Sequence, residues 1–290
     1  SIMAWHHDPV NKIWIAQHHG WRAAFIWMAI PGILAAVMLR YTAVEPQRGI
    51  WDGEVAKAPS ENESLTDIFK SLWASKVFMR ITFAGLLMGF TGYGIGIWTP
   101  AFLVRSHGMT LQGAGAVMGL LGGTAAALGA VLSGWLYDTL AKRDVRWRIG
   151  VPLLGCLLSL PTGLGFYLLP AGDTWQLGSF VIPHAVGAYL LFGVTAVWWT
   201  APVYAVLSEL IAPHRRATAL SIFSLGLTMV GGGLGPLLVG MLSDQLTSYW
   251  GSEALRISLA ITTGTCFTLG ILTFAWAMKA YYAEQNTAKA

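Results

Sequence analysis

Seven apolar segments, each long enough to cross a lipid bilayer, follow one another along the chain. About 20 apolar residues are needed to span a hydrocarbon core of roughly 30 Å. Short turns and one longer polar stretch separate the segments, so we expect each of them to be a transmembrane helix. Their approximate bounds are 21–44, 78–103, 111–138, 147–169, 182–208, 216–242 and 254–280.

The composition supports an all-α membrane protein. Hydrophobic residues make up 55% of the 290 residues and charged residues only 11%, whereas soluble domains carry about 25% charged residues. The net charge of +4 does not indicate nucleic-acid binding, because the basic residues lie in short turns between apolar segments. Cys156 and Cys266 lie within apolar segments, which favours small buried side chains over a disulfide or a metal site.

The basic residues also predict the orientation. When the segments alternate across the bilayer, fourteen Lys and Arg fall on one side and four on the other. Basic residues concentrate in cytoplasmic loops. We therefore expect a multi-pass protein of a bacterial inner or plasma membrane, with its C-terminus in the cytoplasm. The four residues on the outer side are Lys12, Arg22, Arg105 and Arg256.

Two polar stretches lie outside the apolar segments. In 45–76, the pattern that begins at Ser64 predicts a helix start, followed by a short amphipathic helix along the membrane at 68–73; Thr110 is a further predicted N-cap. Near the start, the pairs His6-His7 and His18-His19 invite a metal interpretation. No cysteine or ordered acidic partner accompanies them, so we favour a solvated loop and expect no metal.

The turn after segment 111–138 reads Gly134-Trp-Leu-Tyr-Asp138-Thr-Leu-Ala-Lys142-Arg143. This pattern resembles the signature loop of the major facilitator superfamily of transporters, except that Ala141 stands where the family usually has glycine. Two further stretches, 93–109 and 201–244, resemble the spinster-like branch of that superfamily. An ordinary positive-inside turn is the alternative interpretation of the loop alone.

The resemblance implies the superfamily fold in part, as helices six to twelve of twelve. Together with the start at Ser1, it predicts a fragment whose partner is the missing N-terminal half. The implied parts are an extracytoplasmic loop at 1–20, the last helix of the N-terminal half at 21–44, a cytoplasmic linker at 45–76, a six-helix C-terminal half at 77–282 and a cytoplasmic tail at 283–290.

The resemblance also implies an inner gate. A carboxylate at Asp138 would lie against the N-terminus of a helix in the opposite half, where the helix dipole favours it. Arg143 would pair with Glu209, and Glu209 with one of the arginines beyond it. The alternative is that these charges only fix the topology. The predicted inner-gate residues are Asp138, Lys142, Arg143, Glu209, Arg215 and Arg216.

Segments 78–103 and 182–208 contain glycine and proline, which weaken a helix and are tolerated in a membrane where neighbours or a cavity satisfy the backbone. Aromatic and hydroxyl groups at such breaks suit an amphiphilic ligand. The alternative is that they pack in the core or anchor at the interface. The candidate cavity residues are Tyr93, Trp98, Thr99, Trp198, Thr200, Tyr204 and Thr228.

Small residues recur at four-residue spacing in two segments, which lets helices approach closely in lipid. Simple packing explains this spacing, and so does a need for smooth contacts between helices that rock against each other. The predicted packing residues are Gly115, Gly119, Gly123, Gly231 and Gly235.

We therefore predict a secondary active transporter of a small organic solute, amphiphilic or lipid-like, working by alternating access without a cofactor. A transporter-like sensor without flux is an alternative. A membrane-embedded enzyme is disfavoured, because no set of catalytic groups converges at one depth. No ionisable residue lies at mid-membrane; those within the segments are near helix ends, namely Arg80, His184, Glu209 and Asp244.

Overall fold

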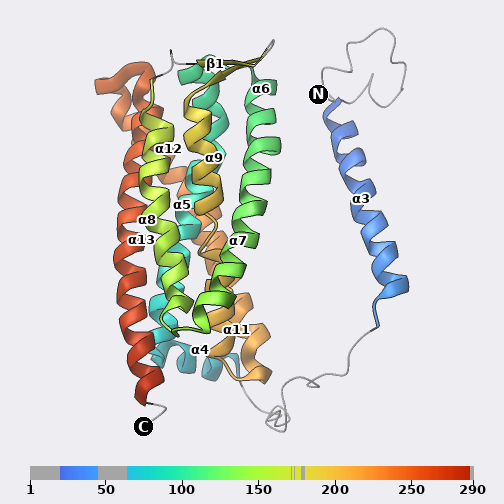
Figure 1. Cartoon of the computed structure of the whole chain (residues 1–290), viewed down its shortest axis with the longest axis vertical. Helices are drawn as coiled ribbons and strands as arrows, with labels where there is room; N and C mark the ends of the chain where they lie inside the picture. Colours follow the sequence, from blue (N-terminus) through green and yellow to red (C-terminus); the bar gives the residue numbers. More distant parts are fainter. Residues whose placement is uncertain (1–19, 45–63, 171, 173, 178–179, 288–290) are drawn as a thin grey trace. The chain divides into compact units, whose positions relative to one another are not determined.

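The computed structural model describes residues 20–44, 64–170, 172, 174–177 and 180–287. The chain divides into two units, Ser1–Ala56 and Lys57–Ala290. In the first unit the described element is helix α3 (Gly20–Thr42), which Pro31 does not interrupt. The second unit is a bundle of long helices (Figure 1). The paired histidines near the chain start, at 6–7 and 18–19, lie outside the described residues.

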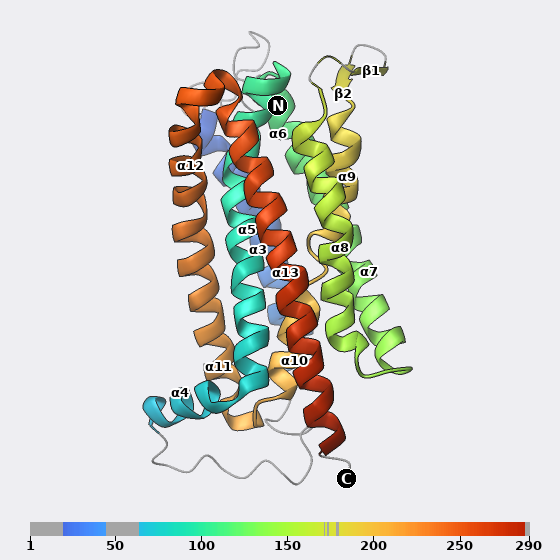
Figure 2. The same cartoon turned by 90° about the vertical axis from the view of Figure 1, so that its left-hand side faces the viewer.

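Six helical runs in the described part of the chain are long and apolar enough to cross a membrane. The last of them, Pro213–Gln285, is 73 residues long and reverses direction at η4 (Gly251–Glu253). Gly251 adopts a φ of +53° there, a conformation that glycine reaches without a steric penalty. Because α12 and α13 then run back beside each other (Figure 2), the six runs make seven passages, in agreement with the seven predicted segments.

The helices of the second unit lie roughly side by side, with α5 in contact with α13, η3 and α12, and with α8 in contact with α9 and α13. Lipid is as apolar as the buried side chains, so close packing rather than exclusion from water holds such helices together. The elements in chain order are α4 (Leu65–Ala74), α5 (Lys76–His107), α6 (Leu111–Ala116), η2 (Val117–Gly122), α7 (Gly123–Ala141), α8 (Trp147–Leu168), β1 (Thr174–Leu177), β2 (Phe180–Pro183), α9 (Ala185–Thr195), α10 (Thr200–Glu209), α11 (Pro213–Gly226), η3 (Leu227–Leu234), α12 (Gly235–Trp250), η4 and α13 (Ala254–Thr287).

Both predicted helix starts are confirmed. The Ser64 hydroxyl accepts a hydrogen bond from the amide of Thr66 at 3.3 Å, and the Thr110 hydroxyl accepts one from the amide of Gly113 at 3.1 Å. Each hydroxyl satisfies one of the amides that the first turn of a helix leaves without a partner. Helix α4 lies across the ends of the long helices (Figure 2), as the amphipathic pattern predicted.

The five predicted packing glycines behave in two ways. A Cβ at Gly231 would lie 2.9 Å from the backbone of Gly89, and one at Gly235 would lie 2.7 Å from a carbonyl of α5, so these two glycines let η3 and α12 lie directly on α5. A Cβ at Gly115, Gly119 or Gly123 would meet no described atom within 4 Å. Those three therefore make no close contact with the other helices of the second unit.

On the same helical run, the close contacts come from two glycines that the four-residue spacing did not select. Gly129 lies against the carbonyl of Val194, and Gly122 against the ring of Tyr189. They are seven residues apart and bring η2 and α7 against α9. Both helical runs with spaced glycines also contain a π-helical stretch, η2 or η3, a rare form that is frequent at functional sites.

The two proline-containing segments differ from each other. Segment 182–208 is broken as expected: α9 ends at Thr195 and α10 begins at Thr200, with a turn between them. Segment 78–103 was also expected to be broken, and this was wrong, because α5 continues through Pro100. Pro100 removes only the N–H that would bond the Gly96 carbonyl. A membrane helix tolerates this loss where neighbouring helices pack against it, as α13, η3 and α12 do here.

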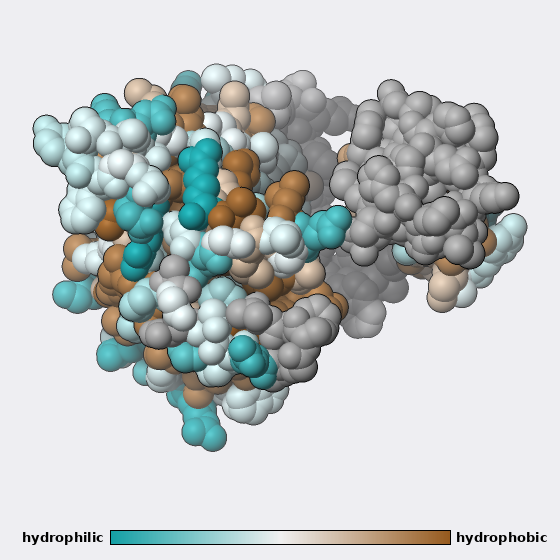
Figure 3. Space-filling model, turned by 90° about the horizontal axis from the view of Figure 1, so that it is seen from above, coloured by the Kyte–Doolittle hydropathy of each residue, from teal (hydrophilic) through white to brown (hydrophobic). Residues whose placement is uncertain are grey.

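The end opposite α4 carries a feature that the sequence did not predict, an antiparallel hairpin of β1 and β2 (Figure 1). The Trp175 ring covers Gly187 and lies 4.6 Å from the His184 ring. Seen from this end, hydrophilic side chains alternate with apolar ones over the surface (Figure 3). Strands of four residues are too short to show an alternating pattern, and the helix predicted at 182–208 includes the last two residues of β2.

At this same end, Arg256 joins α13 to α8. Its guanidinium donates to the carbonyls of Tyr167 at 2.7 Å and Leu168 at 2.6 Å, and it forms an ion pair with Glu253 at 3.0 Å. The last carbonyls of a helix have no partner within the helix, and a basic side chain can satisfy them. The contact therefore fixes the end of α8 to the start of α13.

Candidate functional site

A cavity of about 280 Å³ lies beside the break between α9 and α10. The turn residues Ala196, Val197 and Trp199 line it, together with Thr200. The remaining lining comes from α5, η2, α7, α8, α9 and α13, and none of the lining residues is ionisable other than tyrosine. Most of the lining residues are apolar, and four of them carry a hydroxyl group, namely Thr99, Tyr167, Tyr189 and Thr200.

Two of these hydroxyls are already paired with each other. Thr99 and Tyr167 are buried, and their hydroxyl oxygens lie 3.1 Å apart. Ring contacts of Tyr167 with Phe102 and Phe166, at 5.1 and 4.7 Å between centroids, fix the tyrosine in place. Tyr189 and Thr200 line the cavity without a hydroxyl bond of this kind in the described residues. The cavity thus offers a fixed polar pair and two further hydroxyls.

Of the seven predicted cavity residues, the structure brings Thr99 and Thr200 together in this lining, and the other five lie elsewhere. The Trp98 indole donates to the Pro236 carbonyl at 2.9 Å, which joins α5 to α12. Trp198 is buried against Gly155 of α8. Tyr93 lies against Gly231. Trp98 and Trp198 thus match the alternative that they pack between helices, whereas the Tyr93 side chain is 46% exposed.

The last two candidates make local contacts. The hydroxyls of Tyr204 and Ser224 lie 3.1 Å apart, and this pair joins α10 to α11. The Thr228 hydroxyl donates to the carbonyl of Ser224, one turn earlier in its own helix, at 3.0 Å. Tyr167, Tyr189 and Trp199 also line the cavity, and the sequence analysis did not select them. Its criterion, aromatic and hydroxyl groups near a helix break, applies to Trp199 but not to a residue of another helix such as Tyr167.

A charged cluster lies at the end of the bundle nearest α4. Arg148, in the first turn of α8, forms an ion pair with Glu209, the last residue of α10. The hydroxyl of Tyr137 on α7 donates to the other Glu209 oxygen at 3.4 Å, and Arg148 donates to the Tyr281 hydroxyl on α13 at 3.1 Å. We call these four residues the Arg148–Glu209 cluster; they connect α7, α8, α10 and α13.

The predicted pair of Arg143 and Glu209 is absent, and this detail was wrong. Arg143 is exposed in the turn after α7 and has no ion pair within the described part of the chain, whereas Arg148 lies on a helix that contacts α10. Arg143 and Lys142 do line a polar hollow of about 540 Å³ to which Arg148 also contributes. Asp138 is exposed on the last turns of α7, and it too forms no ion pair with a described residue.

The two arginines beyond Glu209 make other contacts. Arg216 donates to the carbonyl of Ser208 at 2.9 Å, and so satisfies a carbonyl at the end of α10. Arg215 donates to the hydroxyl of Ser71 at 3.2 Å, and so joins α11 to α4. Both arginines therefore stabilise the corner around the Arg148–Glu209 cluster.

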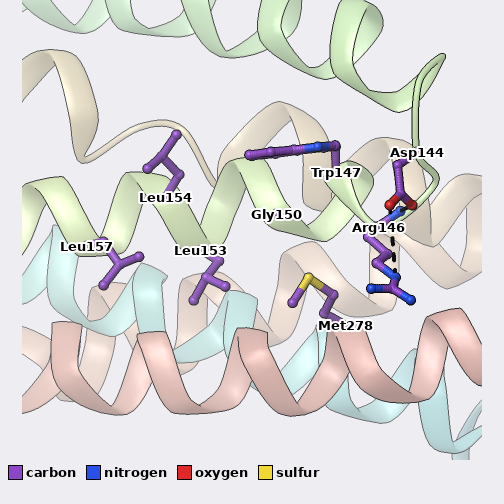
Figure 4. A pocket seen from close by; sticks show the side chains of 8 residues that line it. All are labelled: Asp144, Arg146, Trp147, Gly150, Leu153, Leu154, Leu157 and Met278. Carbon is purple, nitrogen blue, oxygen red and sulfur yellow. Dashed lines mark hydrogen bonds and ion pairs between the residues drawn. The ribbon is translucent and has the colours of Figure 1, made fainter.

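A further hollow, of about 320 Å³, lies between the start of α8 and the end of α13. Figure 4 shows Leu153, Leu154 and Leu157 of α8 along it, with Met278 of α13 opposite. At its polar end Arg146 lies 4.0 Å from Asp144. Among the described residues no group of three or more His, Cys, Asp or Glu could hold a metal ion.

Residues 12–236 match the Major Facilitator Superfamily model. An MFS-type efflux pump of Mycolicibacterium smegmatis is 30% identical, over 92% of this chain and 58% of its own length. Protein spinster homolog 1 of Xenopus laevis is 26% identical, over 74% of this chain and 41% of its own length.

A crystal structure also matches. It is that of a bacterial homologue of the human lysosomal transporter spinster, in an inward-facing and unoccupied conformation. It has a TM-score of 0.65 and 23% identity, and the match covers 97% of this chain and 63% of that one. The chain therefore spans less than two thirds of the length of each of these three proteins. It is a multi-pass membrane protein that belongs to the major facilitator superfamily, a family of transporters rather than enzymes, and has spinster proteins among its homologues.

Proposed function

We propose that the intact protein is a secondary transporter that moves a small amphiphilic solute by alternating access. In this proposal the described bundle supplies one wall of the solute site and one side of the inner gate. The observation that carries it is the cavity at the α9–α10 break, whose largely apolar lining includes four hydroxyl-bearing residues. An amphiphile places its apolar body on such a wall and its polar group on the hydroxyls.

The chemistry of the cavity restricts the solute. Its described lining has no Lys, Arg, Asp or Glu. A charged group in a membrane-embedded cavity is costly unless an opposite charge pairs with it. The described bundle therefore favours an uncharged polar group, or an ionic headgroup that is held outside this cavity, over the buried carboxylate of a sugar acid.

Helix α10 connects the cavity to the gate. Thr200 lines the cavity at the first residue of α10, and Glu209 holds Arg148 at the last. The turn before Thr200 separates this ten-residue helix from α9. A solute that displaces Thr200 would thus move the helix whose other end carries Glu209. In our proposal this movement breaks the Arg148–Glu209 cluster and opens the gate.

The proposal also assigns a partner to the exposed glycines. The homologues are longer than this chain, and superfamily transporters rock two halves against each other. Gly115, Gly119 and Gly123 meet no described atom, so they offer a smooth surface for helices of the opposite half. Asp138, Lys142 and Arg143 lie at the cytoplasmic end of the same run in the predicted orientation, where they would meet that half.

The test is solute uptake by the intact protein in proteoliposomes, with a panel of lysophospholipid, neutral sugar and sugar acid. Thr200→Val replaces one lining hydroxyl with a methyl group of similar size. We expect it to weaken apparent solute affinity by about tenfold, since an unpaired polar group of the solute costs roughly 1–2 kcal/mol. The matched control is Thr228→Val, because Thr228 lies outside the lining and bonds only within its own helix. An equal loss of solute affinity in both variants would count against the proposal, and so would the absence of uptake of any amphiphile.

A further inference from the structure

Another hollow, of about 560 Å³, lies on the flank of the bundle where α4, α5 and α13 meet. Its lining is Trp73, Lys76, Met79, Arg80, Phe83 and Trp276, and we call it the α4–α13 hollow. We propose that this hollow binds an anionic phospholipid from the adjacent leaflet, with the phosphate at Lys76 and Arg80 and one acyl chain along α13. In the predicted orientation that leaflet is the cytoplasmic one.

The first argument is charge. Lys76 and Arg80 are four residues apart on α5, so they lie on the same face of the helix. The hollow has no acidic residue in its lining, and neither base forms an ion pair within the described part of the chain. Two like charges at this spacing repel each other. A phosphate between them removes the repulsion and accepts charge-assisted hydrogen bonds from both.

The second argument is the position of the Arg80 guanidinium. Its central carbon lies 4.0 Å from the centroid of the Trp276 ring, a cation–π contact between α5 and α13. This contact uses the flat face of the guanidinium and leaves the N–H groups along its edge for an acceptor. Arg80 is therefore held in place before a ligand arrives, which lowers the entropic cost of binding.

The third argument is the surrounding apolar surface. Trp73, Phe83 and Trp276 are 66%, 55% and 52% exposed, and exposed aromatic residues beside basic ones are typical of a membrane interface. From Trp276 the exposed surface of α13 continues through Leu272 and Leu269. These three residues are spaced by four and three positions, so they form one apolar stripe. The two basic residues match the phosphate of a phospholipid, and the adjoining apolar stripe matches its acyl chain.

Helix α4 supports the same occupant. Ile68 and Leu72 are buried against the bundle, whereas Phe69 and Trp73 are exposed and stack with a centroid distance of 6.2 Å. A helix that lies across the bundle end with aromatic side chains outward is suited to insertion among lipid headgroups. Trp73 belongs to this helix and to the hollow at once, so lipid binding would also fix α4.

The hollow of Figure 4 provides a comparison at the same end of the bundle. Its single arginine, Arg146, lies 4.0 Å from Asp144 and stacks on the Tyr282 ring at 3.8 Å. The two opposite charges cancel, so this hollow has no reason to prefer an anionic lipid over a zwitterionic one. The α4–α13 hollow, with two bases and no acid, does have that reason.

The test compares the intact protein in nanodiscs of phosphatidylglycerol with nanodiscs of phosphatidylcholine that have the same acyl chains. Bound lipid is counted by native mass spectrometry after release from the disc, and thermal unfolding is followed in parallel. We expect retention of phosphatidylglycerol, and Arg80→Gln should weaken it about fivefold, since one basic residue near an anionic surface contributes about that factor. Arg105→Gln is the matched control, because Arg105 is exposed at the opposite end of the same helix.

Retention lost in Arg80→Gln but kept in Arg105→Gln would support the site. Trp276→Leu keeps the surface apolar and removes the cation–π contact, and a weaker loss in this variant would support the proposed role of the ring. The proposal is overturned if Arg80→Gln, eluting as a folded species, retains phosphatidylglycerol like the wild type. It is overturned equally if both arginine variants lose the lipid to the same extent. It is also overturned if Arg80→Gln converts a dimer of the protein to a monomer in the mass spectrum and leaves the amount of bound lipid unchanged.

Discussion

At the scale of single residues, the predicted inner-gate residues show how far a sequence motif can lead. Glu209 carries an ion pair, although not with the arginine that was predicted. The partner is Arg148, five residues beyond Arg143. A linear pattern cannot distinguish an arginine in a turn from one on a helix that contacts α10, because that difference arises from the packing of α8 on α10.

The first prediction concerns this pair. Glu209→Gln and Arg148→Gln should each lower the stability of the intact protein, and a double-mutant cycle should give a coupling of about 1 kcal/mol. The value is modest because the two side chains remain 40% and 32% exposed, and partly exposed pairs are screened by solvent. Thermal unfolding in detergent measures it. Arg143→Gln is the control and should change stability by less than about 0.5 kcal/mol; a larger coupling of Glu209 to Arg143 would reverse the assignment.

At the scale of helices, hydrophobicity predicted the positions of the long apolar elements well and the detail within them poorly. The caps at Ser64 and Thr110 were predictable because capping depends on neighbouring residues alone. The glycines were harder. Spacing selected Gly115, Gly119 and Gly123, yet the close contact with α9 is made at Gly129. Which face of a glycine-rich helix meets its neighbour depends on the arrangement of the whole bundle, and the spacing rule does not contain that information.

The second prediction follows from this difference. In Gly129→Ala the new methyl group would collide with the Val194 carbonyl, a backbone atom that cannot move aside alone. We expect a loss of about 1–3 kcal/mol in stability. Gly134→Ala, five residues later on the same helix, meets no described atom within 4 Å and should change stability by less than about 1 kcal/mol. Thermal unfolding of both variants checks the pair, and equal stability would show that α7 and α9 are further apart.

At the scale of the whole molecule, the charge distribution predicts the orientation in the bilayer. The third prediction uses single cysteines: Lys142→Cys should react with a membrane-impermeant maleimide from the cytoplasmic side, and Arg105→Cys from the opposite side. The native Cys156 and Cys266 are buried, so they should react slowly and leave a low background. Labelling of both positions from the same side would contradict the alternating passages.

The contacts at the two ends of α8 and α13 have a consequence for how the bundle can move. At one end, Arg256 of α13 bonds the last carbonyls of α8. At the other end, Arg148 of α8 bonds the Tyr281 hydroxyl of α13. Two helices fastened at both ends cannot slide past each other, so they form a fixed frame. Helix α10 has a turn at its start and the Arg148–Glu209 ion pair at its end. In the proposed mechanism, breaking that ion pair and the Tyr137–Glu209 bond frees the end of α10 to swing together with α11, to which Tyr204 joins it, while the frame stays still.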